Sequence, residues 1–102
     1  MVLRADDSEL KRALSPKTLK DLLPEAGPKV VDIRHIAYLD SLGDEALKVF
    51  VILSDDTTTA QIRWDNLGPI RQVIHDAVRS ANDERYPYVR FLTRREYRDT
   101  RS

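Results

Sequence analysis

The C-terminal part of the chain mixes arginine with aromatic residues, a combination that can bind a phosphate-bearing or a protein partner. The candidate binding residues are Tyr86, Tyr88, Arg90, Arg94, Arg95 and Arg98. Guanidinium groups pair with phosphates, and tyrosine rings stack on unpaired bases. The same two residue types concentrate at the anchor points of protein interfaces. The alternative is that Val89, Phe91 and Tyr97 belong to the core and that the arginines are only the solvent-exposed surface around it.

No combination of residues in the sequence predicts a catalytic site. The chain contains no cysteine and only two histidines. His75 and Asp76 are adjacent on a predicted helix, where neighbouring side chains point about 100° apart and cannot form the base and orienting pair of a triad. We expect this pair to lie on a solvated helix face, and His35 to be a structural residue of a strand.

Metal and cofactor sites also lack their usual signatures. Phosphate-binding loops need clustered glycines, and the three glycines of this chain stand alone. Asp44, Asp55 and Asp56 carry oxygen ligands for a divalent ion, but acidic residues in hairpin turns usually serve turn geometry. We therefore predict no metal, no cofactor and no enzymatic activity, with a metal-dependent enzyme built on these carboxylates as the weakest alternative.

Length and composition predict one small domain covering residues 1–102, with frayed ends at residues 1–14 and 98–102. The chain has 102 residues, of which 41% are apolar and 33% charged, so it can bury one modest core. Seventeen basic and seventeen acidic residues cancel, so the field of the whole molecule gives no general attraction to nucleic acid or membranes. From Arg90 onward, however, five arginines face two acids.

The sequence also predicts a cytoplasmic location. No apolar run approaches the roughly 18 residues that a membrane-spanning helix needs. The acidic N-terminal residues do not resemble a signal peptide.

Hydrophobic periodicity predicts an α+β fold organised around one central strand. Residues 46–54 are apolar on both faces, which is typical of a strand with neighbours on both edges. Strands at residues 30–39 and 59–64 should flank it along the chain as an antiparallel meander, and residues 88–92 should form a fourth strand.

Helices are expected before and after the meander. Ser15 and Pro16 should start a helix over residues 16–23, and an apolar stripe predicts a longer helix over residues 67–81. A capping box at residues 93–96 should start a short last helix. The predicted fold is therefore α-β-β-β-α-β, a four-stranded mainly antiparallel sheet with two helices on one face and an open edge.

The order of elements over residues 30–97 resembles two families. Residues 44–53 and the helix after them are similar to the ribosome-binding factor A type of KH-like RNA-binding domain, which implies RNA binding, although the strongly basic character of that family is missing. The chain also resembles the minimal nucleotidyltransferase fold, in which a Gly-Ser pair precedes a strand with two metal-binding aspartates. Here Ser41 and Gly43 are separated and reversed. Lys48 and Val49 stand where the acids would be, which implies a catalytically inactive member.

We therefore expect a small interaction or regulatory module. The leading hypothesis is a protein partner, or a second copy of the chain in a homodimer, bound through the open sheet edge and the Tyr/Arg-rich segment. The first alternative is a KH-like RNA-binding domain, with the same arginines on phosphates and Tyr86 or Tyr88 stacking on bases. The second is an inactive nucleotidyltransferase-like domain. No membrane and no small-molecule cofactor is expected in any of these.

Overall fold

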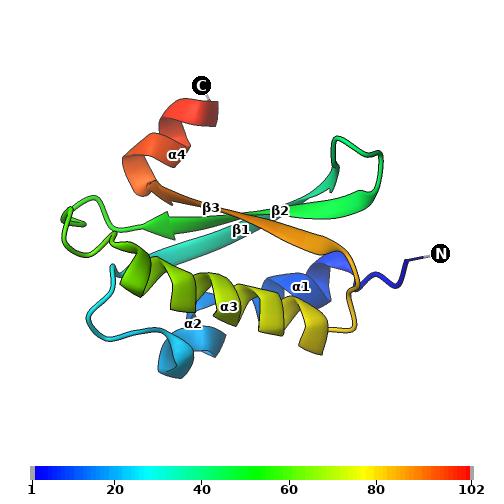
Figure 1. Cartoon of the computed structure of the whole chain (residues 1–102), viewed down its shortest axis with the longest axis horizontal. Coiled ribbons are helices and arrows are strands. Elements are labelled where there is room, and N and C mark those ends of the chain that lie inside the picture. The colour runs from blue at the N-terminus through cyan, green and yellow to red at the C-terminus, as the bar shows by residue number, and fades with distance from the viewer. Residues whose placement is uncertain (1, 102) are drawn as a thin grey trace.

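The computed structural model describes residues 2–101 and shows an α+β fold with a three-stranded mixed sheet between helices on its two sides (Figure 1). The elements are α1 (Asp7–Ala13), α2 (Pro16–Leu19), the 3-10 turn η1 (Lys20–Leu22), β1 (Val30–Leu39), β2 (Glu45–Leu53), α3 (Trp64–Ser80), β3 (Tyr86–Thr93) and α4 (Arg94–Arg101). The helices α1, α2 and α3 lie against one face of the sheet, and α4 stands above the opposite face (Figure 1).

The predicted central strand is β2, and its apolar sequence explains this position. Leu47, Val49 and Val51 are fully buried toward the helices. On one edge β1 pairs with β2 in an antiparallel hairpin, as predicted, and on the other edge β3 pairs with it in parallel. The hairpin turn closes at Gly43, whose φ of 81° lies in the left-handed region where glycine carries no side-chain penalty.

The strand predicted at residues 59–64 does not form. Thr58 and Gln61 instead bond each other's backbone: the Thr58 N–H donates to the Gln61 side-chain oxygen at 2.9 Å, and the Gln61 N–H donates to the Thr58 hydroxyl at 3.3 Å. Polar side chains that satisfy nearby backbone groups compete with a sheet ladder. Residues 59–62 therefore form turns, Arg63 is the N-cap of α3, and Trp64 already belongs to that helix.

The loss of this strand changes the order and direction of the sheet. The helix α3 now connects β2 directly to β3, and a helical crossover returns the chain in the same direction. The sheet is therefore mixed and has three strands, in place of the mainly antiparallel four-stranded sheet that the sequence predicted.

The core lies between the sheet and the three helices α1, α2 and α3. Ile70, Ile74 and Val78 are spaced four residues apart on α3 and are fully buried, as its predicted apolar stripe requires. Leu10 of α1 and Leu14, its C-cap, are equally buried against them. Each such aliphatic side chain stabilises the fold by about 1.5–3 kcal/mol.

A buried ion pair ties the N-terminal segment to the turn before β3. The Asp83 carboxylate accepts from the Arg85 guanidinium at 2.7 Å and from the Ala5 N–H at 3.1 Å. The Leu3 N–H donates to the Glu84 carboxylate in the same region. The bonds of Leu3 and Ala5 thus attach part of the range 1–14, which we expected to fray, to the rest of the fold. The end residues Met1 and Ser102 lie outside the described part of the chain.

The Asp83–Arg85 pair should make stability depend on pH. Burial acts to raise the pKa of Asp83, but hydrogen bonds from Arg85 and Ala5 outweigh it, and the pKa lies below its ordinary value. Such a carboxyl stabilises the fold above its unfolded pKa of about 3.9, and this contribution is lost as the pH falls toward the folded pKa. We expect Asp83→Asn to lower the unfolding free energy at pH 7 by about 3 kcal/mol, because Arg85 loses its buried partner.

Urea unfolding of the wild-type protein and the variant between pH 7 and pH 3 measures this effect. The difference between the two should shrink as the pH falls below about 4, because the carboxyl of the unfolded wild-type chain then becomes protonated and the charge of the folded one stabilises less. Asp76→Asn, at an exposed acid of α3, is the matched control and should change little. A constant difference over the whole pH range would contradict the role of the Asp83 charge.

Candidate functional site

The sheet face opposite α1, α2 and α3, which we call the open face, carries the candidate site. Strand alternation and the pairing register place its side chains in four rows across β1, β2 and β3: Tyr38, Ala46 and Tyr86; Ile36, Lys48 and Tyr88; Arg34, Phe50 and Arg90; Asp32, Ile52 and Leu92. Successive rows are about 7 Å apart, because each strand residue rises by about 3.3 Å. The open face thus has an aromatic end near the β1–β2 hairpin and an arginine end near α4.

Three tyrosines at the aromatic end contact one another, and we call Tyr38, Tyr86 and Tyr88 the tyrosine chain. The ring centroids of Tyr38 and Tyr88 are 5.8 Å apart at an interplanar angle of 81°, and those of Tyr86 and Tyr88 are 4.7 Å apart. Tyr86 is 53% exposed and Tyr88 41% exposed. The rings are therefore held by aromatic contacts and still present surface to a ligand.

Two charged groups contact this chain, a carboxylate at Tyr88 and an ammonium at Tyr38. The Tyr88 hydroxyl donates to the Asp40 carboxylate at 3.2 Å. Loss of water around the phenol, followed by the nearby Asp40 charge, raises the pKa of Tyr88 above its ordinary value, so the phenol stays protonated near pH 7. The Lys48 ammonium lies 4.5 Å from the centre of the Tyr38 ring, within the range of a cation–π contact.

His75 supports the tyrosine chain from α3, so its predicted solvated position is wrong. Its ring meets that of Tyr86 edge to face, with centroids 5.1 Å apart. Its Nε2 atom is inaccessible to solvent and has no hydrogen-bond partner among the described residues. Burial and then the Arg71 charge lower the pKa of His75, so the imidazole is neutral near pH 7. Asp76, by contrast, is exposed as predicted.

The arginine end of the open face contains a hollow of about 580 Å³ beneath α4, which we call the arginine hollow. Its lining residues are Val31, Asp32, Arg34, Ile52, Arg94, Tyr97 and Arg98. The hollow therefore joins guanidinium groups from a strand and from a helix that the sequence separates by about sixty residues.

The helix α4 is positioned over the sheet by contacts at its start and in its middle. The predicted capping box forms: the Glu96 carboxylate accepts from the Thr93 N–H at 2.8 Å, and the Thr93 hydroxyl accepts from the Glu96 N–H at 3.2 Å. The Asp55 carboxylate accepts from the Arg95 N–H at 2.8 Å. Further along, the Tyr97 ring lies 5.7 Å from the Phe50 ring on the open face.

The structure groups most of the predicted binding residues on one side of the sheet. Tyr86, Tyr88 and Arg90 share the open face through alternation along β3, and Arg94 and Arg98 line the arginine hollow. Arg95, the remaining predicted residue, is exposed on α4 outside that lining.

Sequence reasoning missed the contributions of Arg34 and Tyr38 to this surface. Both come from β1, and the register of the hairpin carries them to the open face. The sequence did contain a signal for this. Arg34, Ile36 and Tyr38 occupy alternate positions of the strand, and the length of the turn at residues 40–44 determines which β2 residues lie opposite them.

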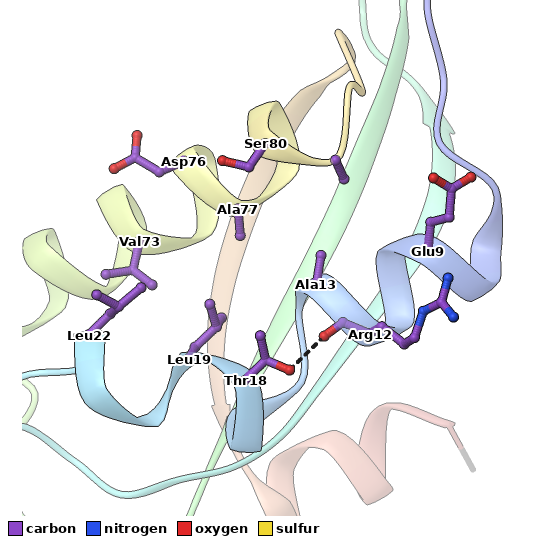
Figure 2. A pocket seen from close by; sticks show the side chains of 11 residues that line it. Glu9, Arg12, Ala13, Thr18, Leu19, Leu22, Val73, Asp76, Ala77 and Ser80 are labelled. Atoms are coloured by element: carbon purple, nitrogen blue, oxygen red, sulfur yellow. Dashed lines mark hydrogen bonds between the residues drawn. The ribbon is translucent and has the colours of Figure 1, made fainter.

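A second hollow, of about 650 Å³, lies between α2 and α3 on the opposite side of the molecule (Figure 2). Leu19, Leu22 and Val73 form much of its wall, and Figure 2 shows Leu22 approaching Val73. One of its polar groups is already engaged, since the Thr18 hydroxyl donates to the Arg12 carbonyl at 2.9 Å. This groove offers mainly apolar contact, so the open face is the better candidate for a polar ligand.

The acidic residues considered for metal binding are far apart. Asp44 precedes β2 and Asp55 follows it, so the nine-residue strand separates them. Within residues 2–101, no group of three or more histidine, aspartate or glutamate side chains is arranged to hold a metal ion. None of the helices in this same range combines the length and apolar composition needed to cross a membrane.

No protein-family model, curated protein or solved structure matches this chain.

Loss of the Tyr97 ring should release α4 from the sheet. We expect Tyr97→Ala to speed amide hydrogen exchange over residues 96–100 by about tenfold, because a half-buried aromatic contact contributes on the order of 1–2 kcal/mol. Exchange in β2 and α3 should stay unchanged. Arg95→Ala is the matched control, since it keeps the backbone N–H that bonds Asp55. Equal exchange in α4 of the wild-type protein and Tyr97→Ala would show that the ring contact does not hold the helix.

Proposed function

We propose that this protein is a non-enzymatic domain that binds single-stranded RNA on its open face. Bases stack on the tyrosine chain, and phosphates pair with Arg90 and with the arginines beneath α4. The observation that carries the proposal is the chain of mutually supported tyrosines, of which Tyr86 and Tyr88 are exposed, on an uncovered sheet face with the Lys48 ammonium beside it. Single-stranded RNA is commonly recognised in this way, by aromatic side chains that stack on splayed bases.

The composition of the open face favours RNA over the protein partner that the sequence alone favoured. Lysine is depleted at the centre of a protein interface, whereas arginine and tyrosine are enriched there, so Lys48 is the residue that favours RNA. Lys48 lies between Ile36 and Tyr88 in one of the two middle rows. A ligand with both aromatic and anionic parts matches this surface better than an apolar one.

RNA binding by a molecule without net charge requires positive charge on one of its faces. With seventeen charges of each sign, the molecule has no net attraction for a polyanion, so binding must come from positive groups concentrated on one face. The arginine end of the open face provides that concentration. Binding should therefore be moderate in strength and sensitive to salt.

Removal of a tyrosine ring should weaken RNA binding. We expect Tyr88→Ala to reduce the affinity for an oligouridylate of about ten nucleotides by about tenfold to a hundredfold, because stacking contributes roughly 1–3 kcal/mol per base. Tyr88→Phe keeps the ring and should bind as the wild-type protein does. Fluorescence anisotropy at several salt concentrations measures both effects, and about three phosphate contacts should give a slope of log K against log salt near −2.

The control for this experiment lies on the opposite side of the sheet. Leu22→Ala removes an exposed side chain of the apolar groove and should leave RNA affinity unchanged. A salt-independent affinity, or equal affinities of the wild-type protein and Tyr88→Ala, would contradict RNA binding on the open face.

The second candidate function is self-association through β1. This strand pairs only with β2 in the described part of the chain, so its outer edge has backbone groups free to extend a sheet. Ile36 is 51% exposed and Leu39 65% exposed on it. Light scattering after gel filtration should then show a dimer that Ile36→Lys converts to a monomer, since lysine on an edge strand opposes further pairing. A wild-type monomer at all accessible concentrations would exclude this candidate.

A further inference from the structure

The arginine hollow has an excess of positive charge that the fold itself does not use. Arg34, Arg94 and Arg98 line it together with a single carboxylate, that of Asp32. Both oxygens of Asp32 are already engaged: Oδ1 accepts from the Ile33 N–H and Oδ2 from the Arg34 Nε, each at 2.8 Å. Two positive charges therefore remain without a compensating acid in the lining.

The two arginines of α4 are arranged in a way that is unfavourable without a ligand. Arg94 and Arg98 are four residues apart, so they lie on the same side of the helix, where like charges repel. Neither of them forms an ion pair within residues 2–100 of the structure. Arg34 faces them from β1 across the hollow. An anion placed between these groups would relieve the repulsion.

We propose that the arginine hollow binds a terminal phosphate of the RNA strand that lies on the open face. This inference rests on the function proposed above and specifies that the hollow binds the phosphorylated end of the RNA. Guanidinium groups suit this ligand because they donate paired hydrogen bonds to phosphate oxygens. The Tyr97 ring and Ile52 supply apolar wall beside the charged groups.

Two observations favour a terminal phosphate over an internal one. First, α4 stands over the sheet at this end of the open face, whereas the hairpin end is uncovered (Figure 1). A strand that runs from the tyrosine chain along the sheet toward α4 therefore meets the helix and ends there. Second, a terminal phosphate has a charge between about −1.5 and −2 at pH 7. This charge matches the two uncompensated positive charges of the hollow, whereas an internal phosphate carries a single negative charge.

The length of the open face is consistent with this placement. The row of Arg34 and Arg90 is the next one along from that of Tyr88 and Lys48, about 7 Å away. The arginine hollow begins in this row, at Arg34, and extends to Ile52 in the row beyond. A short strand can therefore stack its bases on the tyrosine chain while its last phosphate reaches α4.

Competition between RNA strands that differ only at their ends tests the proposal. A labelled oligouridylate is bound to the full-length protein and displaced by unlabelled strands of the same length with a 5′ phosphate, a 3′ phosphate or no terminal phosphate. One of the two phosphorylated strands should compete about tenfold better than the unphosphorylated strand, reflecting charge-assisted hydrogen bonds to the arginines. The end that gains affinity reports the direction of the strand on the sheet.

Variants of α4 locate the effect. The double variant Arg94→Gln, Arg98→Gln should abolish the advantage of the phosphorylated strand while retaining displacement by the unphosphorylated one. Without RNA it should melt at an equal or higher temperature than the wild-type protein, because a repulsion has been removed. Arg12→Gln, at an exposed arginine of α1 on the other side of the sheet, is the matched control and should keep the advantage.

The possible failures are distinguishable. Equal competition by all three strands would overturn the terminal-phosphate site and leave RNA binding intact. An advantage that survives in the double variant would also overturn it, because the phosphate would then lie elsewhere. Failure of every strand to bind would overturn the proposed function and this inference with it.

Discussion

The structure depends on covering β2, a strand that is apolar on both faces. On the helix side the cover is complete, and Leu47, Val49 and Val51 are fully buried beneath α1 and α3. On the open face Ala46 and Ile52 are also nearly inaccessible, although no helix layer lies across the whole of this side. Their neighbours in the rows supply the cover, which links the chemistry of the open face to the stability of the sheet.

The apolar side chains of β2 are covered in different ways at the two ends of the open face. Ala46 is small and lies between Tyr38 and Tyr86, so large rings on the flanking strands shield it. At the other end α4 leans over the sheet with Tyr97 against Phe50. The first solution leaves aromatic surface exposed, and the second leaves a hollow with arginines around it. The surface that we propose for bases and phosphates therefore arises from the way in which β2, a strand apolar on both faces, is covered in a small protein.

Much of the fold could be predicted from the sequence, because local signals agree with the tertiary structure over most of the chain. The strand at residues 30–39, the central strand, the apolar stripe of α3 and the capping box of α4 all form. The failure at residues 59–64 has a clear cause, since Ala60, Ile62 and Trp64 alternate as in a strand while Thr58 and Gln61 satisfy the local backbone. Alternation over so few residues does not outweigh such bonds.

The candidate site was only partly predictable, for a different reason. Its β3 and α4 residues are close together in sequence, so their composition alone indicated a binding segment. That composition also contained core residues, as the alternative interpretation held, since Val89 and Phe91 pack toward the core. Arg34 and Tyr38 come from a distant strand, and only the pairing register brings them to the same surface. The support of Tyr86 by His75 depends on the packing of α3 beside β3, which no local pattern indicates.

NMR titration tests most directly whether RNA binds to the open face, as we propose. Backbone amide signals of the labelled protein would be followed while a single-stranded oligouridylate is added at low salt. We expect shift changes that saturate and that cluster on β1, β2 and β3 around the tyrosine chain and on α4, with the groove between α2 and α3 unaffected. Changes confined to that groove, or no changes at all, would contradict this proposal.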